Sequence, residues 1–242
     1  MSTTLDKISL INILNSGKIN LQGQFLLGSN YTFFAELIYE SDTIPVVYKP
    51  RRGERPLWDF PVNTLGKREV AAYLISDFLE WDLVPPVIYR RRGPLGPGSL
   101  QLFIDHDPEY HYFKFSETDR QRLRPATLFD LIINNADRKA GHILIGKDDH
   151  LWLIDHGICF NTENKLRTVL WEFIGQPIPP DLLSSLNKLV EDLQTKGQLF
   201  QSLRPYLRVS EINAIIRRSE RVLDSGIYPT PSTRFPVPYP PI

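Results

Sequence analysis

The strongest constraint on the fold is a single stretch, residues 128–157, with the sequence LFDLIINNADRKAGHILIGKDDHLWLIDHG. Its first part has apolar residues at helical spacing, and the predicted helix ends at the polar run NNADRKAGH. Two short apolar segments, HILI and LWLI, then flank the polar turn GKDDH, a pattern that predicts a β-hairpin. Pairing of these strands brings the loop that carries Asp137 beside the loop that carries Asp155. The sequence therefore predicts two carboxylates on neighbouring loops, which suits metal binding and phosphoryl transfer.

Length and composition limit the class of protein. The chain has 242 residues, of which 42% are hydrophobic, and a formal net charge of zero, so it can form one large domain or two small lobes. A neutral chain gives no reason to expect nucleic-acid binding. Without a signal-peptide pattern or a run of eighteen apolar residues, we expect a cytoplasmic protein with no membrane span. Cys159 is the single cysteine, which excludes an internal disulfide.

The first hundred residues predict an antiparallel sheet, because strand-like segments alternate with short polar turns. The predicted strands are residues 19–27, 31–39, 44–49, 84–91 and 99–104. Pro45 leads us to expect that the third strand begins at a sheet edge or a bulge. Residues 67–80 have the apolar spacing of an amphipathic helix, and residues 1–16 are compatible with a further short one.

The second half of the chain is predicted to be mainly helical. Residues 118–134, 180–200 and 210–224 have helical patterns, and Pro125 implies a break within the first of them. The last residues, 227–242, are rich in proline and predict an extended tail. This tail docks on its own domain or serves as a ligand for another protein.

The order of these elements and motifs resembles a known family. DRKAGHIL followed by LWLIDHG is similar to the D-R-x-x-x-N and D-F-G motifs of the atypical, phosphatidylinositol 3-/4-kinase-like kinases, and a small bacterial subgroup matches in size. The resemblance implies an α+β, two-lobed protein-kinase-like fold. Residues 1–105 would form a sheet lobe with one helix, residues 106–226 a mainly helical lobe, and residues 227–242 the tail. The helical lobe would hold a catalytic loop at 134–142 and the D-x-G motif at 155–157.

The resemblance also implies roles for individual residues. Asp137 would orient the acceptor hydroxyl, and Arg138 or Lys139 would stabilise charge on the transferred group. Lys49, at the end of the third strand, would contact the ATP phosphates, and Glu69 would hold it in place. Taken alone, Lys49 is better explained as a strand-end lysine that reaches water, and Glu69 could simply stabilise the first turn of its helix. The order of Lys49, Glu69, Asp137 and Asp155 along the chain favours the kinase roles instead. The other expected nucleotide contacts are Gly28, Ser29 and Asn30 in the first turn, Gln101, Phe103 and Ile104 near the adenine, and Ile154.

Two histidines depart from the family pattern. Asp155 would bind Mg²⁺ or Mn²⁺, but His142 stands where an asparagine metal ligand is usual, and His156 stands where protein kinases commonly have phenylalanine. Imidazole suits Mn²⁺ better than Mg²⁺. His142 therefore implies a Mn²⁺ preference, a single metal with His142 on a phosphate, or nucleotide binding with poor transfer.

We therefore predict an ATP-dependent phosphotransferase that moves the γ-phosphate to a hydroxyl of a protein, lipid or small molecule. One alternative is a pseudokinase, a nucleotide-binding interaction module with the same fold. A second is a metal-dependent hydrolase that uses Asp137, His142, Asp155 and His156. The arginines of the loop 50–66 either bind substrate phosphate or form a solvated turn.

Overall fold

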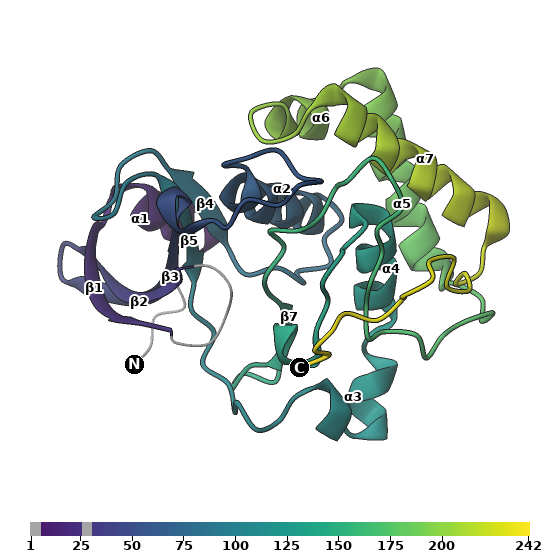
Figure 1. Cartoon of the computed structure of the whole chain (residues 1–242), viewed down its shortest axis with the longest axis horizontal. Coiled ribbons are helices and arrows are strands. Elements are labelled where there is room, and N and C mark those ends of the chain that lie inside the picture. The colour runs from purple at the N-terminus through teal and green to yellow at the C-terminus, as the bar shows by residue number, and fades with distance from the viewer. Residues whose placement is uncertain (1–5, 26–30) are drawn as a thin grey trace.

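The N-terminal lobe contains a five-stranded antiparallel sheet with the strand order β1-β2-β3-β5-β4 (Figure 1). The computed structural model describes residues 6–25 and 31–242. All five predicted strands form, with ends shifted by a few residues. They are β1 (Lys18–Gln24), β2 (Phe33–Tyr39), β3 (Asp42–Pro50), β4 (Val87–Arg90) and β5 (Gly98–Leu102). The turn with Gly28, Ser29 and Asn30 lies outside the described residues.

Pro45 lies in the first part of β3, which pairs with β2 alone, so the prediction that this strand starts at a sheet edge is confirmed. β3 pairs with β2 on one side and with β5 on the other. The Pro45 carbonyl accepts a hydrogen bond of 3.0 Å from the Phe103 N–H, just beyond the end of β5. Proline has no N–H to return a second bond, and the ladder between β3 and β5 ends at this point.

Two helices pack on the sheet, one more than the fold class implied by the resemblance. α1 (Lys7–Ser16) is capped by the Asp6 carboxylate and places Ile13 and Leu14 in an apolar cluster with the sheet residue Leu37. α2 (Leu65–Phe78) contacts β4 and β5. A Cβ atom at Gly66 would lie 3.2 Å from the Ser99 amide nitrogen, so glycine permits the close approach of α2 to β5.

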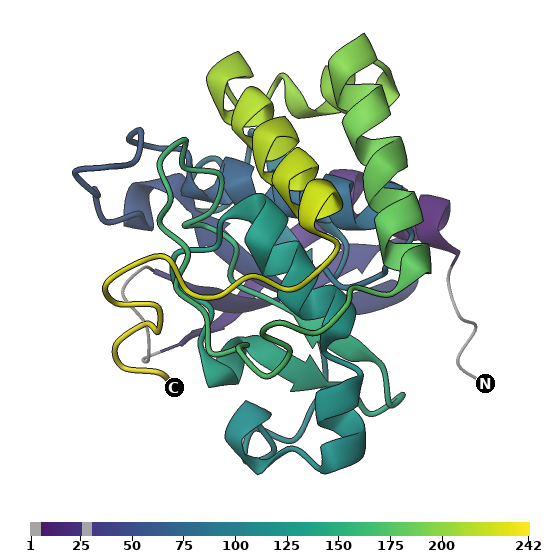
Figure 2. The same ribbon diagram turned by 90° about the vertical axis from the view of Figure 1, so that its right-hand side faces the viewer.

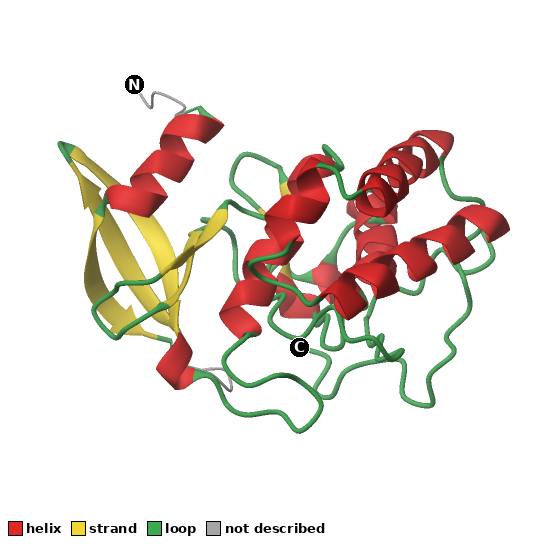
Figure 3. Ribbon diagram, turned by 90° about the horizontal axis from the view of Figure 1, so that it is seen from above, coloured by secondary structure: helices red, strands yellow, loops and turns green. Residues whose placement is uncertain are grey.

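The C-terminal lobe is built from helices around the predicted hairpin, at the opposite end of the molecule from the sheet (Figure 3). The hairpin consists of β6 (Ile143–Ile145) and β7 (Leu151–Leu153). Two predicted helices are each divided in two, the first near Pro125 and the second at Lys196, which has a left-handed φ of 57°. The helices are α3 (Glu117–Gln121), α4 (Arg124–Ile133), α5 (Pro180–Thr195), α6 (Gln198–Leu203) and α7 (Val209–Ser225). Short 3₁₀ turns occur at Arg51–Gly53, Tyr112–Lys114 and Ala140–His142.

One large apolar cluster joins α2 to the helices of the C-terminal lobe. It contains fully buried residues from four helices: Ile75, Phe129, Leu186 and Ile215. α2 therefore packs against both the sheet and the C-terminal lobe, and this double contact fixes where the side chains of α2 lie. Within the described parts of the chain, no helix is both long and apolar enough to cross a membrane.

The C-terminal tail lies along the C-terminal lobe rather than extending into solvent (Figure 2). The Tyr228 side chain is buried, and its hydroxyl donates a hydrogen bond of 2.9 Å to the Arg124 carbonyl. Further along, the Thr168 N–H donates to the Pro236 carbonyl at 2.9 Å, and the Ala140 N–H donates to the Pro241 carbonyl at 2.8 Å. The tail thus contacts both the predicted catalytic loop and the segment that follows Asp155.

Candidate active site

The structure brings Lys49, Glu69 and Asp155 together from three separate elements. Lys49 Nζ lies 2.6 Å from Glu69 Oε1 and 3.1 Å from Asp155 Oδ1. Lys49 is the penultimate residue of β3, Glu69 lies on α2, and Asp155 follows β7. The Glu69 side chain is 3% exposed, whereas that of Asp155 is 47% exposed. Glu69 is therefore a buried support for Lys49, and Asp155 presents its carboxylate to solvent.

The charges of this group reinforce one another. Burial alone would lower the pKa of Lys49, but Asp155 and Glu69 outweigh it and raise that pKa above its usual range. The Lys49 ammonium in turn lowers the pKa of Asp155. Burial raises the pKa of Glu69, but its carboxylate accepts hydrogen bonds from Lys49 Nζ and from the His156 N–H at 2.9 Å, which favour the ionised form. A charged lysine is thus held beside an ionised, half-exposed aspartate.

The predicted catalytic loop reaches the same place from the end of α4. α4 ends at Asn134, which has a left-handed φ of 53°, and the chain then turns so that the Asp137 N–H donates to Asn135 Oδ1 at 3.0 Å. Burial raises the pKa of Asp137 to about 6; the nearby Lys139 opposes this shift and Asp155 adds to it. The Asp137 side chain is therefore mainly ionised at pH 7 and becomes protonated as the pH falls below about 6.

His142 connects the two loops predicted to form the site. Its Nδ1 lies 3.1 Å from the Asp137 carbonyl oxygen, and its Nε2 lies 3.4 Å from Asp155 Oδ2. Burial lowers the pKa of His142 to about 4 despite the nearby Asp155 carboxylate, so the imidazole is neutral at pH 7. A proton on Nδ1, donated to the Asp137 carbonyl, leaves the lone pair of Nε2 facing the Asp155 carboxylate.

This donor set fits a divalent ion. An imidazole nitrogen and a carboxylate oxygen that face each other suit Mn²⁺, whereas Mg²⁺ prefers oxygen alone. The described residues include no group of three or more histidine, cysteine, aspartate or glutamate side chains placed to hold a metal. The remaining ligands would therefore be water or phosphate oxygens, as is usual where a metal ion accompanies a nucleotide.

Arg138 does not lie where the resemblance implied. Its side chain is fully buried and pairs with the equally buried Asp130, with Nη2 and Oδ1 3.0 Å apart. It also donates to the Ile154 carbonyl at 2.7 Å and contacts His156 Nε2 at 2.8 Å. The expected contact of Arg138 with a transferred phosphate is therefore corrected: this side chain holds the catalytic loop against the residues before and after Asp155. Lys139 is partly exposed and remains the candidate cation of the loop.

His156 fills the position of an apolar residue. Its ring is fully buried and packs edge-on against Phe129, with 5.8 Å between the ring centroids. Because Arg138 can only donate, Nε2 of His156 accepts, and the ring is neutral. Burial and the neighbouring Arg138 also lower its pKa well below the usual value. His156 is therefore unavailable as a metal ligand, which removes one of the four residues that the hydrolase alternative requires.

The residues expected near the adenine lie at the end of β5. Gln101 pairs with Val47 of β3, two residues before Lys49, so its side chain shares a sheet face with Lys49. Phe103 packs edge-on against Phe34 with 5.1 Å between ring centroids, and its N–H is used by Pro45. The Ile104 carbonyl is 2.8 Å from His106 Nδ1, and Ile154 directly precedes Asp155. Their contacts with a base stay a prediction.

Sequence analysis missed the buried groups that hold the site in place. Asp130 binds Arg138, accepts from Thr168 Oγ1 at 3.0 Å and accepts from Asn135 Nδ2 at 3.1 Å. Arg68, next to Glu69 on α2, donates to the Cys159 carbonyl at 2.5 Å and pairs with Glu211 at the start of α7. In the sequence, such a buried polar group is indicated only by a charged residue within an otherwise apolar helical stretch, as Asp130 is in LFDLII.

Comparison with solved structures identifies the fold. The fold is that of the protein kinases: the crystal structure of the Golgi casein kinase superimposes with a TM-score of 0.58 at 16% sequence identity, covering 93% of this chain and 80% of that one. At this level of identity the likeness concerns the fold alone.

The family follows from the sequence itself. The profile of the phosphatidylinositol 3- and 4-kinase family matches residues 62–218, and the chain belongs to this family. Protein Rv2133c of Mycobacterium tuberculosis is 38% identical, with 94% of each chain covered. Phosphatidylinositol 4-kinase gamma 4 of Oryza sativa subsp. japonica is 31% identical over 52% of this chain, which corresponds to 26% of that protein. The matched region includes Glu69, Asp137, His142 and Asp155, whereas Lys49 lies before it.

Proposed function

We propose that this kinase-family protein is an ATP-dependent phosphotransferase that moves the γ-phosphate of ATP to a hydroxyl group. The observation that carries the proposal is the distance of 2.6 Å from Lys49 Nζ to Glu69 and of 3.1 Å to Asp155, three residues brought together by strand, helix and loop. A lysine fixed by a buried glutamate and placed beside an exposed aspartate supplies the charges that phosphoryl transfer requires.

Each side chain would have a distinct part. Lys49 would neutralise the α- and β-phosphates, while Lys139 would face the transferred group. Asp137 would orient the acceptor hydroxyl and take its proton as the hydroxyl oxygen bonds to the γ-phosphorus and the bond from that phosphorus to the departing ADP oxygen breaks. A divalent ion neutralises phosphate charge when bound, and Asp155 and His142 would hold it. The Golgi casein kinase, which shares the fold, has been solved with Mn/ADP bound.

A nucleotide-binding pseudokinase is the second candidate. The observation that favours it is the contact of His142 with the Asp137 carbonyl and with Asp155, because an imidazole then occupies the place of the usual asparagine. The two candidates agree on ATP binding and differ on transfer. The metal-dependent hydrolase has less support, because His156 is buried against Phe129 and pairs with Arg138.

The test combines binding with turnover. Thermal unfolding with ATP and either Mg²⁺ or Mn²⁺ measures binding, and formation of ADP measures turnover. We expect wild type to bind and turn over ATP, Asp137→Asn to bind without turnover, and Lys49→Met to lose binding. Asp224→Asn, an exposed carboxylate on α7, is the matched control and should behave as wild type. Binding without turnover in wild type would select the pseudokinase, and binding retained in Lys49→Met would contradict both candidates.

A further inference from the structure

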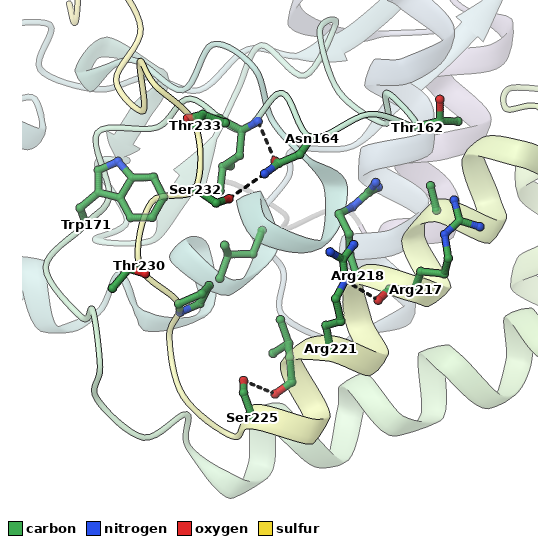
Figure 4. A pocket seen from close by; sticks show the side chains of 15 residues that line it. Thr162, Asn164, Trp171, Arg217, Arg218, Arg221, Ser225, Thr230, Ser232 and Thr233 are labelled. Carbon is green, nitrogen blue, oxygen red and sulfur yellow. Dashed lines mark hydrogen bonds between the residues drawn. The ribbon is translucent and has the colours of Figure 1, made fainter.

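A pocket lined by polar and apolar side chains lies on the C-terminal lobe, and neither Lys49 nor Asp155 lines it (Figure 4). Its volume is about 190 Å³, and its walls come from α7, from the segment that follows Asp155 and from the C-terminal tail. Three arginines of α7, Arg217, Arg218 and Arg221, stand on one side, and the tail residues Ser232 and Thr233 stand opposite. None of the residues named above for nucleotide or metal binding lines this pocket.

The charge of the pocket wall is uncompensated. The described residues that line it include three arginines but neither aspartate nor glutamate. None of these three guanidinium groups forms an ion pair with a carboxylate elsewhere in the described chain. Arg217 and Arg221 are also four residues apart on one helix, where like charges repel. A wall of this kind is unfavourable when empty and is stabilised by a bound anion.

Arg218 gives this pocket a fixed donor. Its Nε donates to the Ile132 carbonyl at 2.9 Å, and its Nη1 donates to the Asn161 carbonyl at 3.2 Å, so the guanidinium cannot turn away. Its Nη2 is buried and has no hydrogen-bond partner. Burial, together with Arg221 and Arg217, lowers the pKa of Arg218 to about 9. An acceptor is therefore missing at this guanidinium.

We propose that the pocket binds a phosphomonoester, with its phosphate oxygens on Arg217, Arg218 and Arg221. Guanidinium groups match phosphate oxygens in pairs, and hydroxyl groups such as those of Thr162 and Thr230 add neutral donors around the rim. The volume admits a phosphorylated small molecule or a lipid headgroup rather than a lone ion. This inference does not depend on the proposed phosphotransferase activity.

The pocket lies where the C-terminal tail is hydrogen-bonded to the segment after Asp155, so a bound phosphate would affect both. Asn164 Nδ2 donates to Ser232 Oγ at 2.8 Å, and Thr233 Oγ1 donates to the Leu166 carbonyl at 3.3 Å. These bonds tie the tail to the segment after Asp155 at the pocket itself. A phosphate on the α7 arginines would join all three elements, so amide hydrogen exchange in residues 161–166 should slow when the pocket is filled.

Calorimetric titration with fructose 1,6-bisphosphate at 0.15 M salt tests the site. Arg217→Gln/Arg221→Gln removes the two exposed arginines and leaves Arg218 and its structural bonds in place. We expect this variant to bind at least about tenfold more weakly than wild type. Arg204→Gln, an exposed arginine outside the pocket, and Lys49→Met should bind as wild type does.

The other outcomes are equally decisive. Absence of saturable binding in wild type, an equal loss in Arg204→Gln, or loss in Lys49→Met would overturn the proposal, the last because the probe would then occupy the nucleotide site. Sedimentation with vesicles that contain phosphatidic acid identifies the source of the phosphomonoester. Sedimentation lost in Arg217→Gln/Arg221→Gln assigns a lipid headgroup, and calorimetric binding without sedimentation assigns a soluble ligand; either result supports the site.

Discussion

At the scale of single residues, the protonation of Asp137 sets the expected pH dependence of activity. Its pKa is raised to about 6, so the carboxylate that we propose as acceptor of the hydroxyl proton is lost below that pH. We expect the initial rate of ADP formation to fall about tenfold per pH unit below pH 6. A rate that stays constant from pH 7.5 to pH 5 would rule out Asp137 as the group that titrates.

The same shift makes a prediction about stability. The folded pKa of Asp137 lies above its usual value of 3.8, so the folded state binds more protons between these values. The contribution of Asp137 to stability therefore falls as the pH rises from about 4 to about 6. We expect Asp137→Asn to raise the Tm at pH 7.5 and to change it less at pH 4. An equal or larger gain at pH 4 would contradict the raised pKa.

His142 is expected to set the metal preference. An asparagine offers Mg²⁺ an oxygen, whereas the imidazole suits Mn²⁺. We predict that His142→Asn increases the rate with Mg²⁺ relative to the rate with Mn²⁺ by roughly tenfold, a change within the range seen for altered metal surroundings. The ratio of the two rates, measured in parallel, checks this. An unchanged ratio would place His142 outside the metal site.

Asp130 tests the buried support beneath the catalytic loop. Both Asp130 and Arg138 are fully buried, so Asp130→Ala would leave an unpaired charge in the core. We expect a loss of about 3–5 kcal/mol in the free energy of unfolding by urea. Asp224→Ala, on the exposed surface, should cost less than about 0.5 kcal/mol. Similar costs for the two variants would show that the Asp130–Arg138 pair does not support the loop.

Some residues could be predicted from the sequence because their order along the chain is informative. Lys49 ends a predicted strand, Glu69 follows on a helix, and Asp155 follows a hairpin, and this order along the chain is the one that the kinase fold brings together at one site. Arg138 could not be placed this way. A residue of a loop can point to solvent or to the core, and the partner that draws Arg138 inward, Asp130, lies in an apolar helical stretch.

At the scale of elements, α2 positions the Lys49 side chain, because Glu69 lies on this helix. Arg68 ties this helix to α7 through Glu211 and to the segment after Asp155 through the Cys159 carbonyl. Arg68→Lys keeps the charge but loses the planar fork that makes both contacts. We predict a smaller increase in Tm on adding ATP than in wild type, because α2 no longer holds Glu69 firmly against Lys49. An increase in Tm on adding ATP that equals that of wild type would show that Arg68 does not help to position Glu69.

The elements themselves were largely predictable, because the strands are short apolar or alternating segments that are separated by polar turns. The predicted element boundaries were wrong where the backbone changes direction within a predicted helix. The helix predicted over residues 180–200 runs through Lys196 and Gly197, yet the left-handed φ of 57° at Lys196 ends α5 there. The glycine that follows is a common helix-stop residue, and α6 begins directly after it.

At the scale of the whole molecule, the tail is expected to steady the two loops of the site. Its carbonyls at Pro236 and Pro241 accept the N–H groups of Thr168 and Ala140. Truncation after Thr233 removes both acceptors and retains the buried Tyr228. We predict faster hydrogen exchange at these two amides, since each lost bond contributes about 0.5–1.5 kcal/mol. Unchanged exchange at both amides would mean that the tail does not support the loops.

The central claim is that residues far apart in sequence form one nucleotide site, and a double-mutant cycle on ATP affinity tests it most directly. Calorimetry would compare wild type, Lys49→Met, Asp155→Asn and the double variant in the presence of Mn²⁺. Because Lys49 Nζ and Asp155 Oδ1 are 3.1 Å apart, we predict that each single variant weakens ATP binding and that the two effects are coupled by at least about 0.5 kcal/mol. Strictly additive effects, or ATP affinity unaffected by either substitution, would contradict the account.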